Sequence, residues 1–545
     1  MSGIGKGITA ASIGKLLQFR GYTVDIIKID PYLNIDPGVL NPVEHGEVFV
    51  TEEVWDFTPV SNTIFKISEI DQDFGAYERF LDKNIHPRNN ITSGQIFLTV
   101  LLKERQGEFL GKTVQIVPHI TDEIKRRIRV VAEQSKVDVI IAEIGGTIGD
   151  IEGMPFIEAI RQLMLEEGKR NAAVVHVTYI PFLDKVGQLK TKPAQHSVKT
   201  LQGMGMQPDI IVGRADIPLT DDVKAKLAMF CNVPENGIIS SSYIDVVYDM
   251  PLNFESQGLG DTLCRILDLP LREPDMSGWS KMAQLFKSAE KVVNIAMPGK
   301  YCAIMDSYVS INEALKHAGA HLGVKVNINW IDTLQFEQNP QSIYMLNKFD
   351  GILLTPGFGF RGVEGMILTA QFAYENKIPF LGICFGAQLM FVAFCRRVLN
   401  LPKANSTEVD PNTPDPVVDL LPEQIQIREK GGTMRLGGHK VYLKKGTKLY
   451  EAYNRDVIVE RFRHRFHIMN DYAKRAESKG LVISSYDEAG STINSIELNN
   501  GGWMVGVQFH PEFKSRPNLP SPIYYQFIKN ALKTHDCEPP QISFG

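Results

Sequence analysis

The chain has 545 residues, of which 43% are hydrophobic and 22% charged, and this composition is typical of a globular protein with two or more domains. Its formal net charge of −5 argues against a nucleic-acid or membrane-surface role, because such binding normally requires clustered Lys and Arg side chains. We therefore expect neither nucleic acid nor a membrane among its partners.

Cysteine usage points to a reducing compartment. The sequence contains six cysteines with no paired spacing: Cys231, Cys264, Cys302, Cys384, Cys395 and Cys537. This pattern predicts neither a disulfide framework nor a zinc site. We also find no signal-peptide pattern and no apolar run long enough to cross a bilayer, so we expect a cytoplasmic protein.

The chain opens on a glycine-rich stretch, "MSGIGKGITAAS", that leads into a helical pattern and contains Lys6. Backbone N–H groups and a cation in such a turn can surround phosphate groups. The pattern is weak by itself, since a full P-loop has Ser or Thr after the lysine and here Gly7 follows. Polar residues follow at or after predicted strands, where α/β folds bind ligands; they are Lys28, Asp30, His45, Glu143, Asp150 and Glu152.

Near-continuous apolar runs predict buried parallel strands in both halves of the chain. Those of the first half are "YTVDIIKID", "VDVIIAEIGG", "NAAVVHVTYI" and "PDIIVGRAD". Those of the second half are "VVNIAMPGKY", "VKVNINWID", "DGILLTPGFG", "IPFLGIC" and "WMVGVQFHPEF". We predict two tandem α/β domains, residues 1–271 and 292–545, each a mainly parallel sheet with helices on both faces. The alternation of apolar runs and helical stretches is lost over residues 272–291, which we predict to be the linker. The polar stretch 405–416 predicts a surface loop.

Cys384 stands between a predicted strand, Ile378 to Ile383, and a helical pattern from Gln388 to Asn400. The flanking Gly382 and Gly386 would permit a sharp turn. A thiol at such a turn lies over a helix N-terminus, whose partial positive charge lowers a thiol pKa. A buried structural cysteine is the alternative interpretation.

A thiolate nucleophile needs a base, and the base needs a third group to orient it. His510 follows a predicted strand, and Glu512 lies two residues further, where an extended chain points both side chains to one side. A lone His-x-Glu is weak, but it occurs here together with Gly-x-Cys-x-Gly in an α/β domain. We therefore predict Cys384, His510 and Glu512 as the catalytic residues.

With these motifs the second half resembles the class I glutamine amidotransferases, in which a thiolate attacks the glutamine amide and ammonia leaves. The resemblance implies that the N–H of Phe385 helps to hold the oxyanion. The second donor should come from "TPGFG", where Pro356 has no N–H, so Gly357 or Phe358 is left. The family's glutamine-binding positions correspond to Gly357, Phe385, Gln388, Glu408 and Arg465; solvated surface side chains are the alternative for the last three.

Over almost its whole length the chain resembles the CTP synthase family. The motifs that carry this resemblance are "SGIGKGI", "KIDPYLNID", "EHGEVFVTE", "AYERF", "GKTVQIVPHIT", "EIGGTIGDIE", "KTKPAQHSVK" and "MFCNVP". The resemblance implies an ATP site at Gly3, Gly5, Lys6, Gly7, Lys28 and Asp73. It implies magnesium held by Asp73 and Glu143, since carboxylates suit that hard cation. It implies a UTP/CTP site at Ser2, Asp150, Ile151, Glu152, Lys190, Lys192, Gln195 and Lys226.

The activity implied by this resemblance is the amination of UTP to CTP: ATP phosphorylates O4 of UTP, and ammonia from L-glutamine displaces the phosphate. In this family ammonia travels inside the protein, GTP activates the glutaminase and CTP inhibits. The family forms homotetramers and is prone to polymerise into filaments.

The sequence departs from this family at several places. The family begins with a strand and a Gly-Gly turn before the segment that is residue 2 here, so we expect a missing first strand. An apolar insert lies near 53–70, and Ala194 and Gln188 stand where Thr and Glu are expected. A faulty gene model and real divergence both explain the first two departures. Two alternative functions follow: a glutaminase with an impaired synthetase half, and a non-catalytic assembly or filament subunit.

Overall fold

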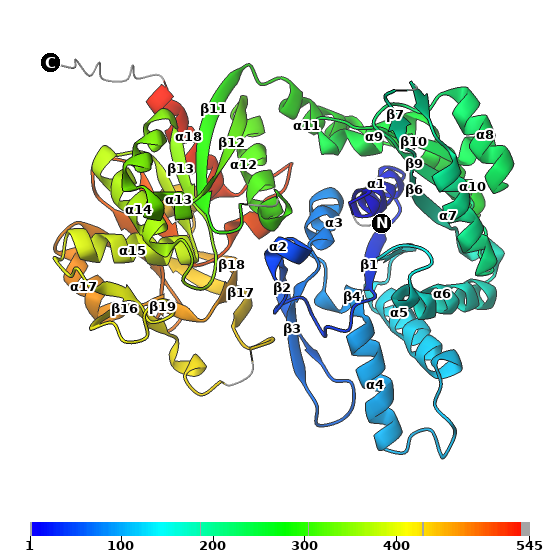
Figure 1. Cartoon of the computed structure of the whole chain (residues 1–545), viewed down its shortest axis with the longest axis horizontal. Coiled ribbons are helices and arrows are strands. Elements are labelled where there is room, and N and C mark those ends of the chain that lie inside the picture. Colours follow the sequence, from blue (N-terminus) through cyan, green and yellow to red (C-terminus); the bar gives the residue numbers. More distant parts are fainter. Residues whose placement is uncertain (1–2, 186, 303–304, 428–429, 536–545) are drawn as a thin grey trace. The chain divides into compact units, whose positions relative to one another are not determined.

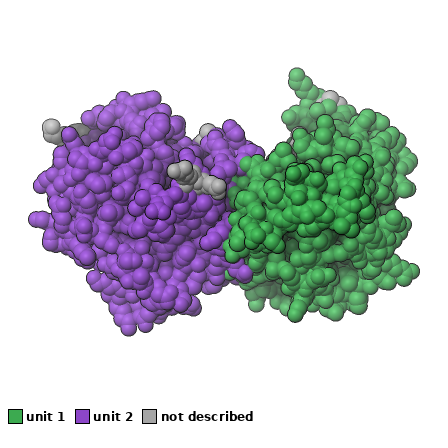
Figure 2. All heavy atoms as spheres, turned by 90° about the horizontal axis from the view of Figure 1, so that it is seen from below, with its two compact units in different colours: residues 1–37, 55–65, 73–283 green, residues 38–54, 66–72, 284–545 purple. Residues whose placement is uncertain are grey.

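The computed structural model describes residues 3–185, 187–302, 305–427 and 430–535. It separates into two compact units, which Figure 2 colours separately. Unit 1 comprises residues 1–37, 55–65 and 73–283, and unit 2 comprises residues 38–54, 66–72 and 284–545. The chain passes from one to the other inside the expected linker. Two segments of the first half, residues 38–54 and 66–72, belong to unit 2. The units therefore do not coincide with the expected domains, and the expected domain boundaries stay a prediction.

Unit 1 is built from short parallel strands and the helices that cover them (Figure 1). Its strands are β1 (Val24–Asp30), β4 (Asn90–Thr92), β5 (Val139–Ile144), β6 (Val175–Tyr179), β7 (Phe182–Leu183), β8 (Gln188–Leu189), β9 (Ile210–Arg214) and β10 (Ile238–Ser241). Its helices are α1 (Lys6–Phe19), α3 (Asp73–Leu81), α4 (Ser93–Arg105), α5 (Thr121–Ser135), α6 (Met154–Glu167), α7 (Lys192–Gly203), α8 (Asp221–Cys231), α9 (Met250–Ser256) and α10 (Leu259–Ile266). Helix α11 (Ser277–Lys287) crosses into unit 2.

Six strands of unit 1 form two separate parallel sheets of three, in the orders β4-β1-β5 and β10-β9-β6, and β7 and β8 pair antiparallel in a two-stranded sheet. The four strands expected in the first half are confirmed as β1, β5, β6 and β9. Strands β1 and β10 are buried throughout, whereas β5 and β6 are half-exposed over most of their length although both are rich in apolar residues. Each of these two strands is an edge of its sheet within the described residues.

The apolar insert forms a regular element. Strands β2 (Phe49–Phe57) and β3 (Phe65–Ile70) pair in a two-stranded sheet, and the hydroxyls of Thr51 and Ser68 lie 3.1 Å apart between them. Near its tip, the guanidinium of Arg127 lies 4.9 Å from the ring of Trp55 and 5.1 Å from that of Phe57. The apolar character of the insert therefore reflects packing in the fold.

Unit 2 contains a longer sheet and its covering helices. Its strands are β11 (Lys291–Gly299), β12 (Val324–Asp332), β13 (Gly351–Leu354), β14 (Phe380–Ile383), β15 (Ala404–Ser406), β16 (Asp415–Leu420), β17 (Arg435–Leu443), β18 (Val457–His464), β19 (Phe466–Ile468), β20 (Leu481–Tyr486), β21 (Ile493–Leu498) and β22 (Met504–Val507). Its helices are α2 (Pro42–His45), α12 (Val309–His321), α13 (Leu334–Gln338), α14 (Val363–Asn376), α15 (Phe385–Arg397), α16 (Lys448–Tyr453), α17 (Asn470–Glu477) and α18 (Pro522–His535).

Nine strands of unit 2 form one sheet in the order β12-β11-β13-β14-β22-β21-β20-β17-β18. The first five pair in parallel, and these are the five strands expected in the second half. The other four pair antiparallel, which the sequence analysis did not anticipate. The two-domain α/β fold class is confirmed.

The large sheet is buried on both faces. Ile352 and Leu354 of β13 belong to a core with α14 and α15, whereas Leu353 belongs to a second core with α12 and α18 (Figure 1). Successive strand residues point to opposite faces, so a strand buried on both sides needs apolar side chains throughout.

The surface loop expected over 405–416 is confirmed only in part. Its two ends belong to β15 and β16, which pair in a small three-stranded sheet with β19. Within the described part of the chain, no helix is both long and apolar enough to cross a membrane.

Candidate active site

Cys384 occupies a strained turn between β14 and α15. Its φ of 51° and ψ of −104° are unusual for a residue with a side chain. The neighbouring glycines permit the turn as expected, although the cysteine itself takes the positive φ. Glycine is required for space: a Cβ on Gly386 would lie 2.3 Å from the carbonyl oxygen of Leu354, and one on Gly382 would lie 3.0 Å from the nitrogen of Ala387.

Helix α15 begins at Phe385, three residues before the expected start, so Cys384 is its N-cap. The side chain of Cys384 is 3% exposed. A helix leaves its first-turn N–H groups without intrahelical partners, and these groups carry partial positive charge. The sulfur therefore belongs to the residue at the partly positive end of this helix.

His510 and Glu512 form a buried pair beside this turn. Nδ1 of His510 lies 2.8 Å from Oε1 of Glu512, and the hydroxyl of Tyr524 donates to the other carboxylate oxygen at 3.4 Å. Burial lowers the pKa of His510, but Glu512 and Cys384 outweigh it and raise that pKa to about 10. The other ring nitrogen, Nε2, is buried and makes no hydrogen bond to the described residues. It is thus the ring nitrogen that can exchange a proton with Cys384.

Two groups that the sequence analysis missed contact the sulfur. The side-chain amide of Gln508 donates to Sγ at 3.4 Å, and the carbonyl oxygen of Arg463 lies 3.6 Å from it. Gln508 stands in the quoted run "VQFHPEF", but nothing in the sequence distinguishes it from an ordinary strand residue. Only the pairing of β14 with β22 brings it to the sulfur.

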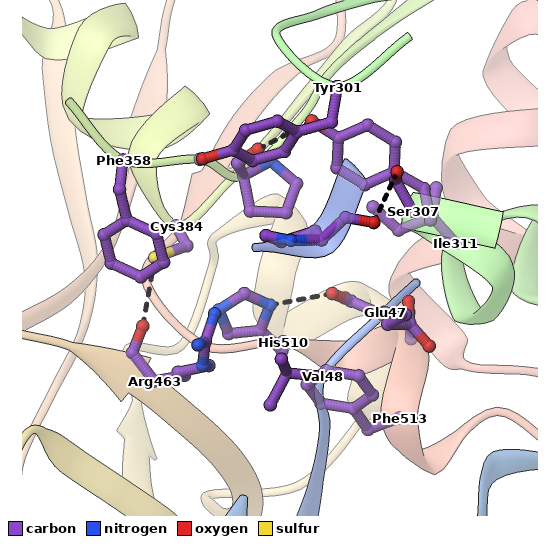
Figure 3. Close-up of a pocket in the computed structure, with 15 residues that line it drawn as sticks. Glu47, Val48, Tyr301, Ser307, Ile311, Phe358, Cys384, Arg463, His510 and Phe513 are labelled. Carbon is purple, nitrogen blue, oxygen red and sulfur yellow. Dashed lines mark hydrogen bonds and ion pairs between the residues drawn. The ribbon is translucent and has the colours of Figure 1, made fainter. Parts of the chain in front are cut away.

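A pocket lies over these groups, and all of its lining residues belong to unit 2. Figure 3 shows Cys384 and His510 on the same side of it as Phe358 and Arg463. The full lining consists of Pro42, Glu47, Val48, Tyr301, Ser307, Tyr308, Ile311, Pro356, Gly357, Phe358, Cys384, Arg463, His510, Glu512 and Phe513. The three predicted catalytic residues and Gly357 therefore share one cavity.

The remaining expected glutamine-binding residues do not line this pocket. Gln388 is buried and donates to Oε1 of Gln508 at 3.0 Å and to the carbonyl of Phe466 at 2.8 Å. Glu408 accepts from the N–H of Gly359 at 2.7 Å, and burial raises the pKa of this carboxyl.

Arg465 donates to Gln424 at 2.7 Å and to Thr433 at 2.9 Å. Phe385 is 1% exposed and is likewise absent from the lining. The structure therefore brings together the catalytic set but not the full expected glutamine-binding set.

Unit 1 gathers charged side chains at the carboxyl ends of β1 and β5. The ammonium of Lys28 lies 2.8 Å from Oε1 of Glu143 and also forms an ion pair with Asp73. The hydroxyl of Tyr77, which the sequence analysis did not single out, donates to Glu143. Burial raises the pKa of Glu143, although Lys28 opposes this effect. The two carboxylates expected to bind magnesium, those of Asp73 and Glu143, thus both pair with the ammonium of Lys28.

The glycine-rich start adjoins this cluster. Gly3 and Gly5 have φ values of 74° and 86°, which favour glycine. The ammonium of Lys6 donates to the carbonyl of Gly146 at 3.0 Å. A Cβ on Gly7 would lie 2.5 Å from Oδ1 of Asp73, so glycine is needed there for close approach. The expected ATP-binding residues that the structure describes therefore lie together.

The expected UTP/CTP residues lie mostly on exposed surface. Asp150 accepts from the N–H of Thr147 at 2.9 Å, and the side chain of Ile151 is 80% exposed. Glu152 is exposed too, and Ser2 lies outside the described residues.

Lys192 and Gln195 lie on α7 and Lys226 lies on α8, whereas Lys190 precedes α7. The ammonium of Lys192 lies 5.5 Å from the ring of Phe230, four residues after exposed Lys226. Gln195 is buried and donates to Thr191 at 3.0 Å, and Lys190 donates to Gln188 at 3.0 Å. The cations are neighbours on the surface, whereas the amide of Gln195 is turned inward.

Comparison with known proteins agrees with this geometry. The sequence model described as "Glutamine amidotransferase class-I" matches residues 303–530, which contain the cysteine turn and the His510–Glu512 pair. The second half is therefore a class I glutamine amidotransferase domain. A second model, "CTP synthase N-terminus", matches residues 1–269.

Relatives match over nearly the whole chain. A CTP synthase of Pyrococcus abyssi is 50% identical over 534 residues, which cover 97% of this chain and 96% of the relative. A CTP synthase of Carboxydothermus hydrogenoformans is 47% identical over 535 residues, 98% of this chain and 97% of the relative. A solved glutaminase domain of a Trypanosoma brucei CTPS covers 44% of this chain and 94% of its own, at 32% identity and a TM-score of 0.42. The chain belongs to the CTP synthase family.

Proposed function

We propose that this protein is a ligase that aminates UTP to CTP with ATP and glutamine. Both halves of the chain match the family that carries out this reaction. The observation that carries the proposal is the buried arrangement of Cys384, His510 and Glu512 at the turn between β14 and α15. This arrangement provides a nucleophile, its base and the group that orients the base.

In the glutaminase step, the proton of Cys384 is held on Nε2 of His510, and the thiolate attacks the glutamine amide carbon. The oxyanion then collapses, the C–N bond breaks, and ammonia leaves with the proton of Nε2. Water hydrolyses the resulting thioester, which releases glutamate and restores Cys384. Glu512 holds the proton on Nδ1 and stabilises the imidazolium that forms. The oxyanion is held by the N–H groups of Phe385 and Gly357. Gly357 is the better second donor, because the backbone of Phe358 already hydrogen-bonds the hydroxyl of Tyr301.

We assign glutamine binding to Gly357, Phe385, Gln388, Glu408 and Arg465. Gln388, Glu408 and Arg465 are hydrogen-bonded to protein groups in the structure. Glutamine binding would exchange those bonds for bonds to its own carboxylate and amino groups. This exchange requires the loops around Gly359 and Gln424 to adjust.

In the synthetase step, Lys6 and Lys28 bind the phosphates of ATP, together with the backbone of Gly3, Gly5 and Gly7. Asp73 and Glu143 fit magnesium, because their carboxylate oxygens converge on one cation, the ammonium of Lys28. Bound magnesium would neutralise phosphate charge during transfer to O4 of UTP.

UTP binding is assigned to Ser2, Asp150, Ile151, Glu152, Lys190, Lys192, Gln195 and Lys226, and most of these residues that the structure describes lie on the surface. Lysines suit a triphosphate because each brings a compact positive charge. We further propose that CTP inhibits at this site, that GTP activates the glutaminase, and that the enzyme works in the cytoplasm as a homotetramer able to form filaments. Contacts between subunits would then complete the UTP site.

The test is CTP formation by the unmutated chain from UTP, ATP and magnesium, followed by the absorbance change from UTP to CTP. The proposal expects activity with glutamine and also with ammonium chloride at alkaline pH. Glutamate release without CTP from either donor would indicate an impaired synthetase half. Neither glutamate nor CTP would indicate an assembly subunit and contradict the proposal.

A further inference from the structure

Lys300 follows the last residue of β11 and does not line the pocket. Its side chain is 5% exposed. Its ammonium donates to the carbonyl of Phe358 at 3.1 Å and also to that of Gly359. The same ammonium lies 4.4 Å from the centre of the Phe385 ring. One buried cation therefore contacts both chain segments to which we assign the oxyanion donors.

The stem of Lys300 also packs against the loop that contains those carbonyls. A Cβ on Gly357 would lie 3.2 Å from Cδ of Lys300. The loop is anchored from its other side by Tyr308, whose hydroxyl donates to the carbonyl of Pro356 at 3.0 Å. The N–H of Gly357 shares its peptide plane with the carbonyl of Pro356, which Tyr308 holds, and Lys300 holds the carbonyls of Phe358 and Gly359 that follow in the same loop.

Two carboxylates, those of Glu408 and Glu337, act on the buried charge of Lys300. Burial lowers its pKa to about 8, Glu408 and Glu337 oppose this effect, and Arg361 adds to it. A buried ammonium is costly unless its donors are satisfied, and the carbonyls of Phe358 and Gly359 satisfy them. A structural role alone would be served as well by an apolar side chain of similar volume.

We propose that Lys300 is a positioning residue for oxyanion stabilisation in the glutaminase. It holds the loop of Gly357 to Gly359 so that the N–H of Gly357 faces the pocket, and it places positive charge beside Phe385. It acts through the backbone and not by touching glutamine. This inference rests on the proposed function of the Cys384 site.

The test compares Lys300→Met with Lys300→Arg and with a control, Lys448→Met. Lys448 is suited as a control because it also lies in unit 2, donates to the carbonyl of Gly502 at 3.0 Å, and has a pKa lowered by burial. It lies outside the proposed catalytic and binding machinery. Any general cost of removing a buried lysine should appear in both Met variants.

For Lys300→Met we expect kcat for glutamine hydrolysis to fall about 10- to 100-fold, somewhat less than removal of a whole oxyanion donor. KM should stay within about threefold, because the lost interaction serves the transition state. Lys300→Arg should restore most of the rate, and Lys448→Met should stay within about twofold of the unmutated chain.

Alkylation of Cys384 by iodoacetamide separates positioning from damage to the nucleophile. This reaction forms no oxyanion, so Lys300→Met should be alkylated at the rate of the unmutated chain. An unchanged kcat, or an alkylation rate that falls in parallel with kcat, would overturn the inference. If the unmutated chain is alkylated but releases no glutamate, the proposed function fails first and the inference falls with it.

Discussion

The two strand-end sites of this protein differ in how completely the chain itself assembles them. In unit 2, Cys384, His510 and Glu512 are each at most 5% exposed and line one pocket, and His510 is hydrogen-bonded to Glu512. In unit 1, Lys28 is paired with the two carboxylates that should hold a metal, and most of the expected UTP residues lie on the surface. The glutaminase site is thus built by the fold, whereas the nucleotide site needs its ligands to complete it.

The sheets show the same contrast. In unit 2, β14 lies inside a nine-stranded sheet and is buried throughout. In unit 1, β5 and β6 are edges of two separate sheets, and their apolar side chains are half-exposed. Strand β14 pairs with β13 on one side and β22 on the other. This pairing stabilises the end of β14 enough to offset the backbone strain at Cys384. The same support is weaker around Glu143 on β5.

The largest expected effect is on the charged cluster of unit 1. Glu143→Gln removes one of the two carboxylates assigned to magnesium, so CTP formation should fall about a thousandfold or more with glutamine and with ammonium alike. Glutamine hydrolysis should persist. As a control, Glu166→Gln on the surface of α6 should leave CTP formation within about twofold. Loss of both activities in Glu143→Gln would mean that the two sites are not separable.

The next effect concerns the charge state of the catalytic pair. In Glu512→Gln the carboxylate that opposes burial is gone, so the pKa of His510 should drop and the imidazole should be neutral at pH 7. Glutamine hydrolysis should fall about a hundredfold or more.

In the unmutated chain His510 should stay protonated until the pH rises through about 10. Titration of the His510 imidazole followed by NMR should therefore show a higher pKa in the unmutated chain than in Glu512→Gln. Identical titration curves for the two proteins would contradict the pairing.

A smaller effect is expected on the exposed UTP set. Lys192→Ala should weaken UTP binding about tenfold, because one cation is lost from a triphosphate site, and leave glutamine hydrolysis intact. Titration calorimetry with UTP before and after the change measures it. Equal UTP affinity in the unmutated chain and in Lys192→Ala would indicate that Lys192 is a solvent-exposed side chain that does not bind UTP.

The smallest effect concerns the half-exposed edges of unit 1. Adding an apolar strand and a Gly-Gly turn before residue 2 should pair β5 or β6 and cover its apolar side chains. We expect the melting temperature to rise by about 2–4 °C for each kcal/mol gained, and ATP to bind more tightly. An extension of matched length with a Gly/Ser-rich sequence is the control. This account would be contradicted if neither extension changed the melting temperature, or if the apolar and the Gly/Ser-rich extension changed it equally.

The sequence predicts the parallel strands well, and it predicts three catalytic residues that the structure brings to one pocket, for definable reasons. Strands such as β13 and β14 are buried on both faces and therefore read as unbroken apolar runs. Cys384, His510 and Glu512 are conspicuous because their residue types and spacing match a known chemistry. The antiparallel strands β17 and β18 were missed because they contain as many charged and glycine residues as a loop.

Other features depend on contacts that no local pattern carries. Gln508 and Lys300 act through residues distant in the chain, so only the fold reveals them. Gly382 and Gly386 were expected to permit the turn at Cys384, but only the fold shows that they do so through close packing against Ala387 and Leu354. Tyr77 joins the charged cluster through helix α3, which the sequence alone does not place beside β5.

The central claim, that the Cys384 site supplies ammonia to a separate synthetase site, is tested most directly by Cys384→Ala assayed with two nitrogen donors. The account predicts that glutamine-dependent CTP formation falls by about three orders of magnitude or more. It also predicts that CTP formation from ammonium chloride at alkaline pH stays close to that of the unmutated chain. Full glutamine-dependent activity in Cys384→Ala, or equal loss with both donors, would contradict it.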